Sequence, residues 1–165
     1  MAPVKILVVT NEDDEIEIFN QRQLKEMKVS EDDANAMFEG RAYWMRFELK
    51  SCTFADQQSV TRECTKDGVV DDTQMPAKRF VKAVVADSWQ KQLVGAKETQ
   101  LLTVSEDAFA ALSPPGLGNA IDYAILTNWY PGASKTRDFI REWQEKQAAL
   151  DAEIQSKSSP STPVS

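Results

Sequence analysis

The stretch from Arg79 to Trp129 limits the fold of this chain more than any other part of the sequence. A helix is predicted to start at Pro76, because proline is favoured at the first helical position. Its apolar residues recur at every fourth position, as is typical of an amphipathic helix: Val81, Val85, Trp89 and Leu93. Gly95 then provides a C-terminal cap for this helix.

Two further helices are predicted in the same stretch. Ser105 is an N-cap candidate, and the helix that it starts is broken by the sequence SPPG at 113–116, since proline cannot continue a helix interior. A third helix follows and ends at Trp129. Six of its residues share one face: Leu117, Ile121, Ala124, Ile125, Asn128 and Trp129.

The strand signals lie in the first 52 residues. The segments KILVVT and EIEIF predict two short strands joined by an acidic turn. Residues 41–52 alternate between two faces, with Tyr43 and Phe47 on one side and Trp44 and Arg46 on the other. This alternation predicts a strand with one buried and one solvated face, and with Trp44 at a sheet edge.

Two more helices are predicted from their N-caps. Ser30 is followed by three acidic residues, which favours a short helix over 31–38 that Gly40 closes. Thr53, with Asp56 three residues later, predicts a helix over 54–66.

A long last helix is predicted over about 135–157. Its apolar face follows the alternating spacing of three and four residues that is typical of a coiled coil: Ile140, Trp143, Gln147, Leu150 and Ile154. The pattern leaves three alternatives open, because this helix could pack back onto the domain, pair with a copy of itself, or pair with another protein. Residues 156–165 lack apolar periodicity and are predicted to be a disordered tail.

These elements predict a mostly helical α+β fold. Short N-terminal antiparallel strands within residues 1–52 are expected to pack on a bundle of four to five helices. The helical core is predicted at 53–132 and the C-terminal helix at 133–155, so that residues 1–155 form a single domain.

The net charge and the short apolar runs of the chain argue against nucleic acid and membrane as partners. The 165 residues carry a net charge of −7 and no Lys/Arg-rich run, which disfavours nucleic-acid binding. The apolar runs are far shorter than the roughly 20 residues of a membrane-spanning helix. The first residues lack the apolar core of a secretory signal, so the chain is expected to be cytoplasmic where it is made.

Few residues are suited to catalysis or metal binding. The chain has no histidine, which removes the commonest general base and metal ligand. Cys52 and Cys64 are interpreted as buried or half-buried thiols, and the carboxylates lie mainly in solvated loops. We therefore expect no catalytic residues, no metal, no cofactor and no enzymatic activity.

Tryptophans and the last helix are the candidates for a partner surface. Trp129 and Trp143 either anchor the core or help form a groove for an apolar helix of a partner. The residues that we predict to contact a protein partner are Trp129, Ile140, Trp143, Leu150 and Ile154.

Residues 45–130 also carry a pattern of short motifs. A strand leads into CTFADQQ, with Thr53, Phe54 and Asp56, and a predicted helix later ends in Trp89. The segment LLTVSEDAFAALSPPGLGNAIDYAI follows, and its matching residues are Val104, Ser105, Phe109, Leu112, Pro114 and Pro115. In this order, the pattern resembles bacteriophage tail assembly chaperones and related small phage tail proteins.

The resemblance implies a binding function without catalysis. Such chaperones are acidic proteins of the host cytoplasm, and they keep the long, helical, apolar tape measure protein soluble during virion morphogenesis. The expected partner is therefore the tape measure protein or another tail protein, with a homo-oligomer as a further alternative. A minor structural subunit of the phage tail or neck is the second function that this resemblance implies.

Overall fold

The computed structural model describes residues 2–129 and 132–158, the latter range with side chains for 140–156. The chain divides into two compact units, of which the first ends at Trp129.

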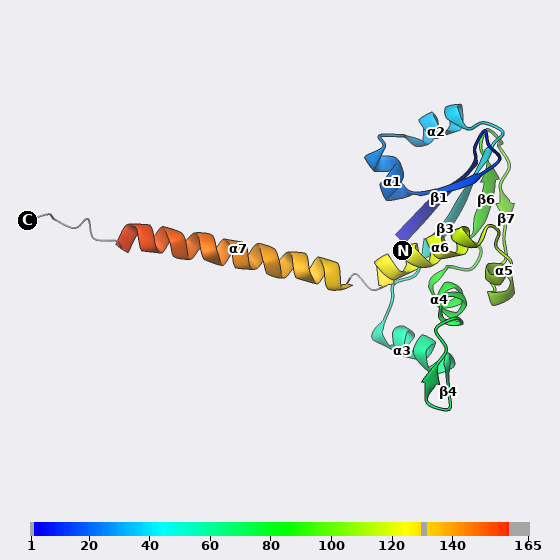
Figure 1. Ribbon diagram of the computed structural model, residues 1–165. Helices are drawn as coiled ribbons and strands as arrows, with labels where there is room; N and C mark the ends of the chain where they lie inside the picture. The colour runs from blue at the N-terminus through cyan, green and yellow to red at the C-terminus, as the bar shows by residue number, and fades with distance from the viewer. Residues whose placement is uncertain (1, 130–131, 159–165) are drawn as a thin grey trace, which may run out of the picture. The chain divides into compact units, whose positions relative to one another are not determined.

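The first unit is built on one antiparallel sheet (Figure 1). Within the described residues its strands follow the order β2-β1-β3-β6-β7. Their bounds are Ala2–Thr10 for β1, Ile16–Asn20 for β2, Ala42–Leu49 for β3, Gln90–Leu93 for β6 and Gln100–Leu101 for β7.

The strands β1 and β3 form the centre of the sheet and are buried on both faces. On one face, Ile6 of β1 pairs with Met45 of β3, and both side chains are at most 2% exposed. On the other face, Leu7 pairs with Trp44, and both side chains are at most 3% exposed. Because these strands have apolar residues on both faces, both faces must pack against other elements, and helices pack on each of them.

Four helices cover the first face. They are α3 (Phe54–Glu63), α4 (Met75–Ala83), α5 (Glu106–Ala110) and α6 (Pro115–Trp129). The predicted apolar face of α6 is confirmed, because its buried residues lie four positions apart: Leu117, Ile121, Ile125 and Trp129. They join Phe80, Trp89 and the β1 and β3 side chains in the larger core of the molecule.

The second face is covered only in part. The helices α1 (Gln21–Glu26) and α2 (Glu31–Met37) place Leu24 and Ala34 over Leu7, Val9 and Trp44. In Figure 1 these helices lie at the upper end of the sheet, whereas α3 and the β4 strand (Thr65–Lys66) lie at the lower end. The uncovered part of this face carries the polar side chains of Lys5, Arg46 and Gln92.

The predicted N-caps are confirmed. The hydroxyl groups of Ser30, Thr53 and Ser105 each accept a hydrogen bond from the backbone N–H three residues later. At Ser30 and Thr53 the carboxylate of the third residue accepts from the cap backbone N–H, which completes a reciprocal capping box. Local sequence therefore fixes where these helices begin.

The prediction of strands confined to the N-terminal part was wrong. The sheet gains β6 and β7 from residues 90–101, and β4 pairs with β5 (Val69–Val70) in a separate hairpin. The helices accordingly cover a sheet that extends through the middle of the chain, instead of forming a bundle beside N-terminal strands.

The helix predicted from Pro76 ends at Ala83, before most of its expected apolar stripe. Val84 bridges to Leu49, and the backbone N–H of Val85 donates to the Glu48 carbonyl at 2.9 Å. The central strand β3 therefore supplies backbone partners that the helix would otherwise satisfy internally. Because β3 lies between β1 and β6, Trp44 is in a central strand, and its predicted position at a sheet edge was wrong.

The second unit contains α7, which runs from Gly132 to Ser158. Residues 156–158, predicted as the start of a disordered tail, belong to this helix. The rest of the predicted tail, 159–165, lies outside the described residues. Within the described part of the chain, no helix is both long and apolar enough to cross a bilayer.

Candidate functional site

An apolar stripe on α7 is the strongest candidate for a partner surface. We call it the α7 seam, and its members are Ile140, Trp143, Gln147, Leu150 and Ile154. Residues spaced three and four apart lie on one face of a helix, so these side chains form a continuous line. The exposed fractions of the four apolar members are 47% for Ile140, 55% for Trp143, 49% for Leu150 and 54% for Ile154.

The α7 seam offers binding energy that the helix itself does not use. Every side chain described on α7, from 140 to 156, is exposed. Covering the exposed half of each apolar seam residue would contribute about 1 kcal/mol per side chain. A helix of this kind gains most of its stability by packing its apolar face on another element.

Charged residues flank the α7 seam on both sides. Arg141 and Glu145 lie one turn apart with Nε and Oε1 separated by 4.0 Å. Such an exposed pair contributes little to stability. Lys146 and Asp151 stand directly beside the seam positions 147 and 150 in the sequence. This arrangement of an apolar line with charges at its edges is typical of a helix that pairs with another helix.

Trp129 does not belong to this surface. Its side chain is 3% exposed and lies in the core of the first unit. The indole N–H donates to the Lys50 carbonyl at 3.2 Å, and the Trp129 carbonyl accepts from Gln57 Nε2 at 3.0 Å. Of the two interpretations of Trp129, the structure therefore supports the core anchor.

The tryptophans of the sheet are also packing residues. Trp89 is 2% exposed, and its indole N–H points to the sulfur of Met45 at 2.7 Å. Trp44 donates its indole N–H to Asn35 of α2 at 3.0 Å. Both side chains thus satisfy their polar atom inside the fold, as buried tryptophans usually do.

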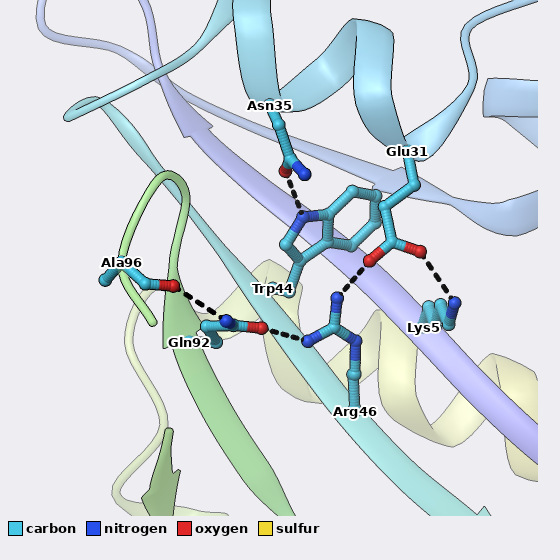
Figure 2. A network of polar contacts seen from close by, with 7 residues as sticks. All are labelled: Lys5, Glu31, Asn35, Trp44, Arg46, Gln92 and Ala96. Atoms are coloured by element: carbon cyan, nitrogen blue, oxygen red, sulfur yellow. Dashed lines mark hydrogen bonds and ion pairs between the residues drawn. The ribbon is translucent and has the colours of Figure 1, made fainter. Parts of the chain in front are cut away.

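A polar network on the uncovered part of the sheet is the second candidate (Figure 2). Glu31, the first residue of α2, accepts from Lys5 of β1 at 2.8 Å and forms an ion pair with Arg46 of β3. Arg46 also donates to Gln92 of β6, whose amide donates to the Ala96 carbonyl at 2.8 Å. No local pattern in the sequence indicates this network, because its members come from distant segments.

The positive charges of the network stabilise the ionised form of Glu31. Hydrogen bonding to Lys5, with the nearby charge of Arg46, lowers the pKa of Glu31 below its ordinary value. The Arg46 guanidinium also lies 5.5 Å from the centre of the Trp44 ring. Among the described residues, no buried side-chain nitrogen or oxygen lacks a hydrogen-bond partner. The network therefore joins α2 to three strands and has a structural role.

Open cavities adjoin both faces of the sheet. One of about 390 Å³ on the face of the polar network is lined by Lys5, Arg46, Glu48 and Asp87, whose charges balance. Another of about 330 Å³ lies on the opposite face and is lined by Tyr43, Trp89 and Lys91, among others. Lys91 Nζ stands 4.2 Å from the centre of the Tyr43 ring, and burial raises the pKa of Tyr43.

The residues that could bind a metal or act as nucleophiles are dispersed. Cys52 is half-buried and Cys64 is buried; both are free thiols, and burial raises the pKa of each. Among the residues that the structure describes, no group of three His, Cys, Asp or Glu side chains is placed to hold a metal ion.

The motif residues that carry the family resemblance have mostly structural roles. Thr53 and Asp56 form the capping box of α3, while Trp89 and Phe109 lie in the core. Phe54 is the exception, because its side chain is 73% exposed. The predicted helix ending in Trp89 is absent from the first unit, where α4 ends at Ala83.

Comparisons of this chain with protein-family models, with curated protein sequences and with solved structures found no match.

Proposed function

We propose that this chain is a non-enzymatic binding protein of phage tail assembly. In this proposal the α7 seam takes up an apolar helix of the tape measure protein and keeps it soluble in the host cytoplasm. One observation carries the binding function, namely four half-exposed apolar side chains in line on one helix face. An amphipathic helix that binds an apolar helix in this way is a common mode of recognition.

Two further features support the proposal. The net charge of −7 favours solubility of the chain, and it would lend that property to a complex with an apolar partner. The motif residues between 45 and 130 resemble those of tail assembly chaperones, and this resemblance is the support for the tape measure protein as the partner. The first unit then serves as a stable, acidic body that carries the binding helix.

The test is co-expression of the full chain with the tape measure protein of the same phage. We expect the tape measure protein to remain soluble and to co-purify with the chain. Trp143→Ala should lower the co-purified amount about tenfold, because a central aromatic anchor typically contributes more than 1 kcal/mol to binding. The matched control is Glu142→Ala, which changes an exposed neighbour outside the α7 seam and should have no effect.

Thermal melting of the same variants separates binding from folding. Trp143 lies on α7, so Trp143→Ala should leave the cooperative melting of the first unit unchanged. Equal co-purification of wild type and Trp143→Ala would contradict the proposed site. Detection of the chain in purified virions would favour the minor tail or neck subunit instead of a chaperone.

A further inference from the structure

The α7 seam has a polar residue at its centre, and this residue indicates a specific occupant. Gln147 stands between two apolar residues on each side of the line. We propose that, without another partner, the α7 seam pairs with the α7 seam of a second copy of this chain. The pairing is a parallel, in-register, two-stranded coiled coil.

The apolar residues match a two-stranded coiled coil. In heptad notation, Ile140 and Ile154 occupy a positions, whereas Trp143 and Leu150 occupy d positions. The isoleucines at a and Leu150 at d favour two strands over three or four, while Trp143 occupies the other d position. The backbone of α7 is helical from 132 to 158, so the whole seam lies within one continuous helix.

Gln147 specifies the register and the direction of the pair. It occupies the central a position, and in a parallel in-register pair it meets Gln147 of the second copy. Each amide can then donate to and accept from the other. A slip by one heptad would place Gln147 against Ile140 or Ile154, and an antiparallel pair would place it against a d residue such as Leu150. A buried amide without a hydrogen-bonding partner is costly, so both alternatives are disfavoured.

The flanking charges are compatible with this arrangement and provide a test of it. Lys146 is at a g position and Asp151 at the following e position. In a parallel pair these residues face each other across the two helices, and the symmetry of the pair produces this contact twice. In an antiparallel pair Lys146 would face Glu153 and Asp151 would face the uncharged Gln144, so the charges fit either direction and Gln147 decides between them.

Self-pairing would keep the α7 seam covered in the absence of a partner. Self-pairing covers the apolar line until a partner helix competes for it, and this part of the inference rests on the proposed function. The self-pairing itself requires no tape measure protein and can be measured on the purified chain.

The first experiment measures the mass of the full chain by sedimentation at about 1 to 500 µM. A dimer with a dissociation constant in this range changes from monomer to dimer across the series. We expect the mass to rise with concentration from 18.5 kDa toward twice that value. Leu150→Glu should remain monomeric throughout, while the first unit melts as in the wild type. A wild-type chain that stays monomeric would overturn the inference, as would a Leu150→Glu dimer of unchanged strength.

The second experiment tests direction with charge reversals at low ionic strength. Asp151→Lys should weaken the dimer about five- to tenfold, because two attractive contacts become repulsive. Adding Lys146→Glu to Asp151→Lys should restore the wild-type affinity. An Asp151→Lys variant of unchanged affinity, or a double variant that stays weak, would overturn the parallel arrangement. In an antiparallel pair the new carboxylate at 146 would face Glu153, so the double variant could not recover.

The two proposals fail in different ways. A monomeric chain that still captures the tape measure protein would overturn self-pairing and leave the proposed function intact. A dimer that never captures the tape measure protein would overturn the proposed function and leave self-pairing intact.

Discussion

Arg79 of α4 and Asp122 of α6 form a two-point ion pair in which each of two guanidinium nitrogens lies 2.9 Å from a different carboxylate oxygen. Their side chains are only 10% and 13% exposed. Because the pair connects two helices that cover the same face of the sheet, it fixes the position of α6 on α4.

Removing the carboxylate of this pair should destabilise the first unit. We expect Asp122→Ala to lower the free energy of unfolding by about 3 kcal/mol, since a buried guanidinium loses its countercharge. Urea unfolding monitored by tryptophan fluorescence measures this change. The control is Glu98→Ala at an exposed loop position, which should change stability by less than about 0.5 kcal/mol.

The double replacement Arg79→Met with Asp122→Leu tests the interpretation further. Apolar residues of similar size avoid the cost of burying two charges, so the double variant should be more stable than Asp122→Ala alone. A double variant less stable than the single one would show that the pair contributes more than charge compensation.

Glu31 should make stability depend on pH in the acidic range. The hydrogen bond from Lys5 and the charge of Arg46 hold the pKa of Glu31 below its ordinary value of about 4.3. A carboxyl whose pKa is lower in the folded state stabilises the fold above the unfolded pKa. It loses this contribution as the pH falls through the folded pKa.

Glu31→Gln should therefore lower stability at pH 7 and make the decline at pH values below the ordinary glutamate pKa less steep. The measurement is urea unfolding at a series of pH values. Asp32→Asn is the matched control, because it removes an exposed carboxylate from the same helical turn. An identical pH profile for the wild type and Glu31→Gln would contradict a stabilising role for the network.

Truncating a buried phenylalanine should destabilise the fold, whereas truncating an exposed one should not. Phe80 is fully buried, with its ring centre 4.9 Å from those of Trp89 and Phe109. Phe80→Ala should cost about 3–5 kcal/mol because it leaves a cavity in the core. Phe54→Ser should change the melting temperature little, since that side chain is 73% exposed. A large loss for Phe54→Ser would show that its ring is covered in solution.

The two thiols should label slowly and at different rates. Burial raises the pKa of both, and the thiolate is the reactive form. We expect Cys52, which is half-buried, to react with an alkylating reagent before the buried Cys64. Mass spectrometry of the labelled peptides in native buffer and in urea gives both rates. Equal native rates would show that Cys64 is exposed by local opening.

Local signals in the sequence predicted the elements that depend on local interactions. The caps at Ser30, Thr53 and Ser105 need only residues three positions away, so their helices were found near the correct starts. The buried face of α6 was found for a similar reason, because its periodicity lies within one segment.

Elements whose conformation is decided by distant partners against or without a local signal could not be predicted. Trp89 has the spacing of a helical stripe, yet its chain segment leaves the helix because β3 offers backbone partners to Val84 and Val85. The β6 sequence QKQL carries no strand signal of its own, and its pairing with β3 decides its conformation.

The same distinction between local and distant contacts applies to the two candidate sites. The α7 seam was visible in the sequence because all its members lie on one helix. The polar network around Arg46 was not, since Lys5, Glu31 and Gln92 meet only when three segments come together (Figure 2). Trp129 was ambiguous in the sequence, because an apolar helix face serves equally well for a core or for a contact.

The position of β6 beside β3 also sets the order in which the chain can fold during synthesis. Tyr43 pairs with Leu93, about fifty residues later. At about 5–20 residues per second, roughly 3 to 10 seconds separate the translation of the two strands. During that interval one edge of β3 has no neighbouring strand, and Met45 lacks its contact with the Trp89 indole. The α7 helix is translated only afterwards, so its apolar face emerges behind residues that already contain every strand of the sheet.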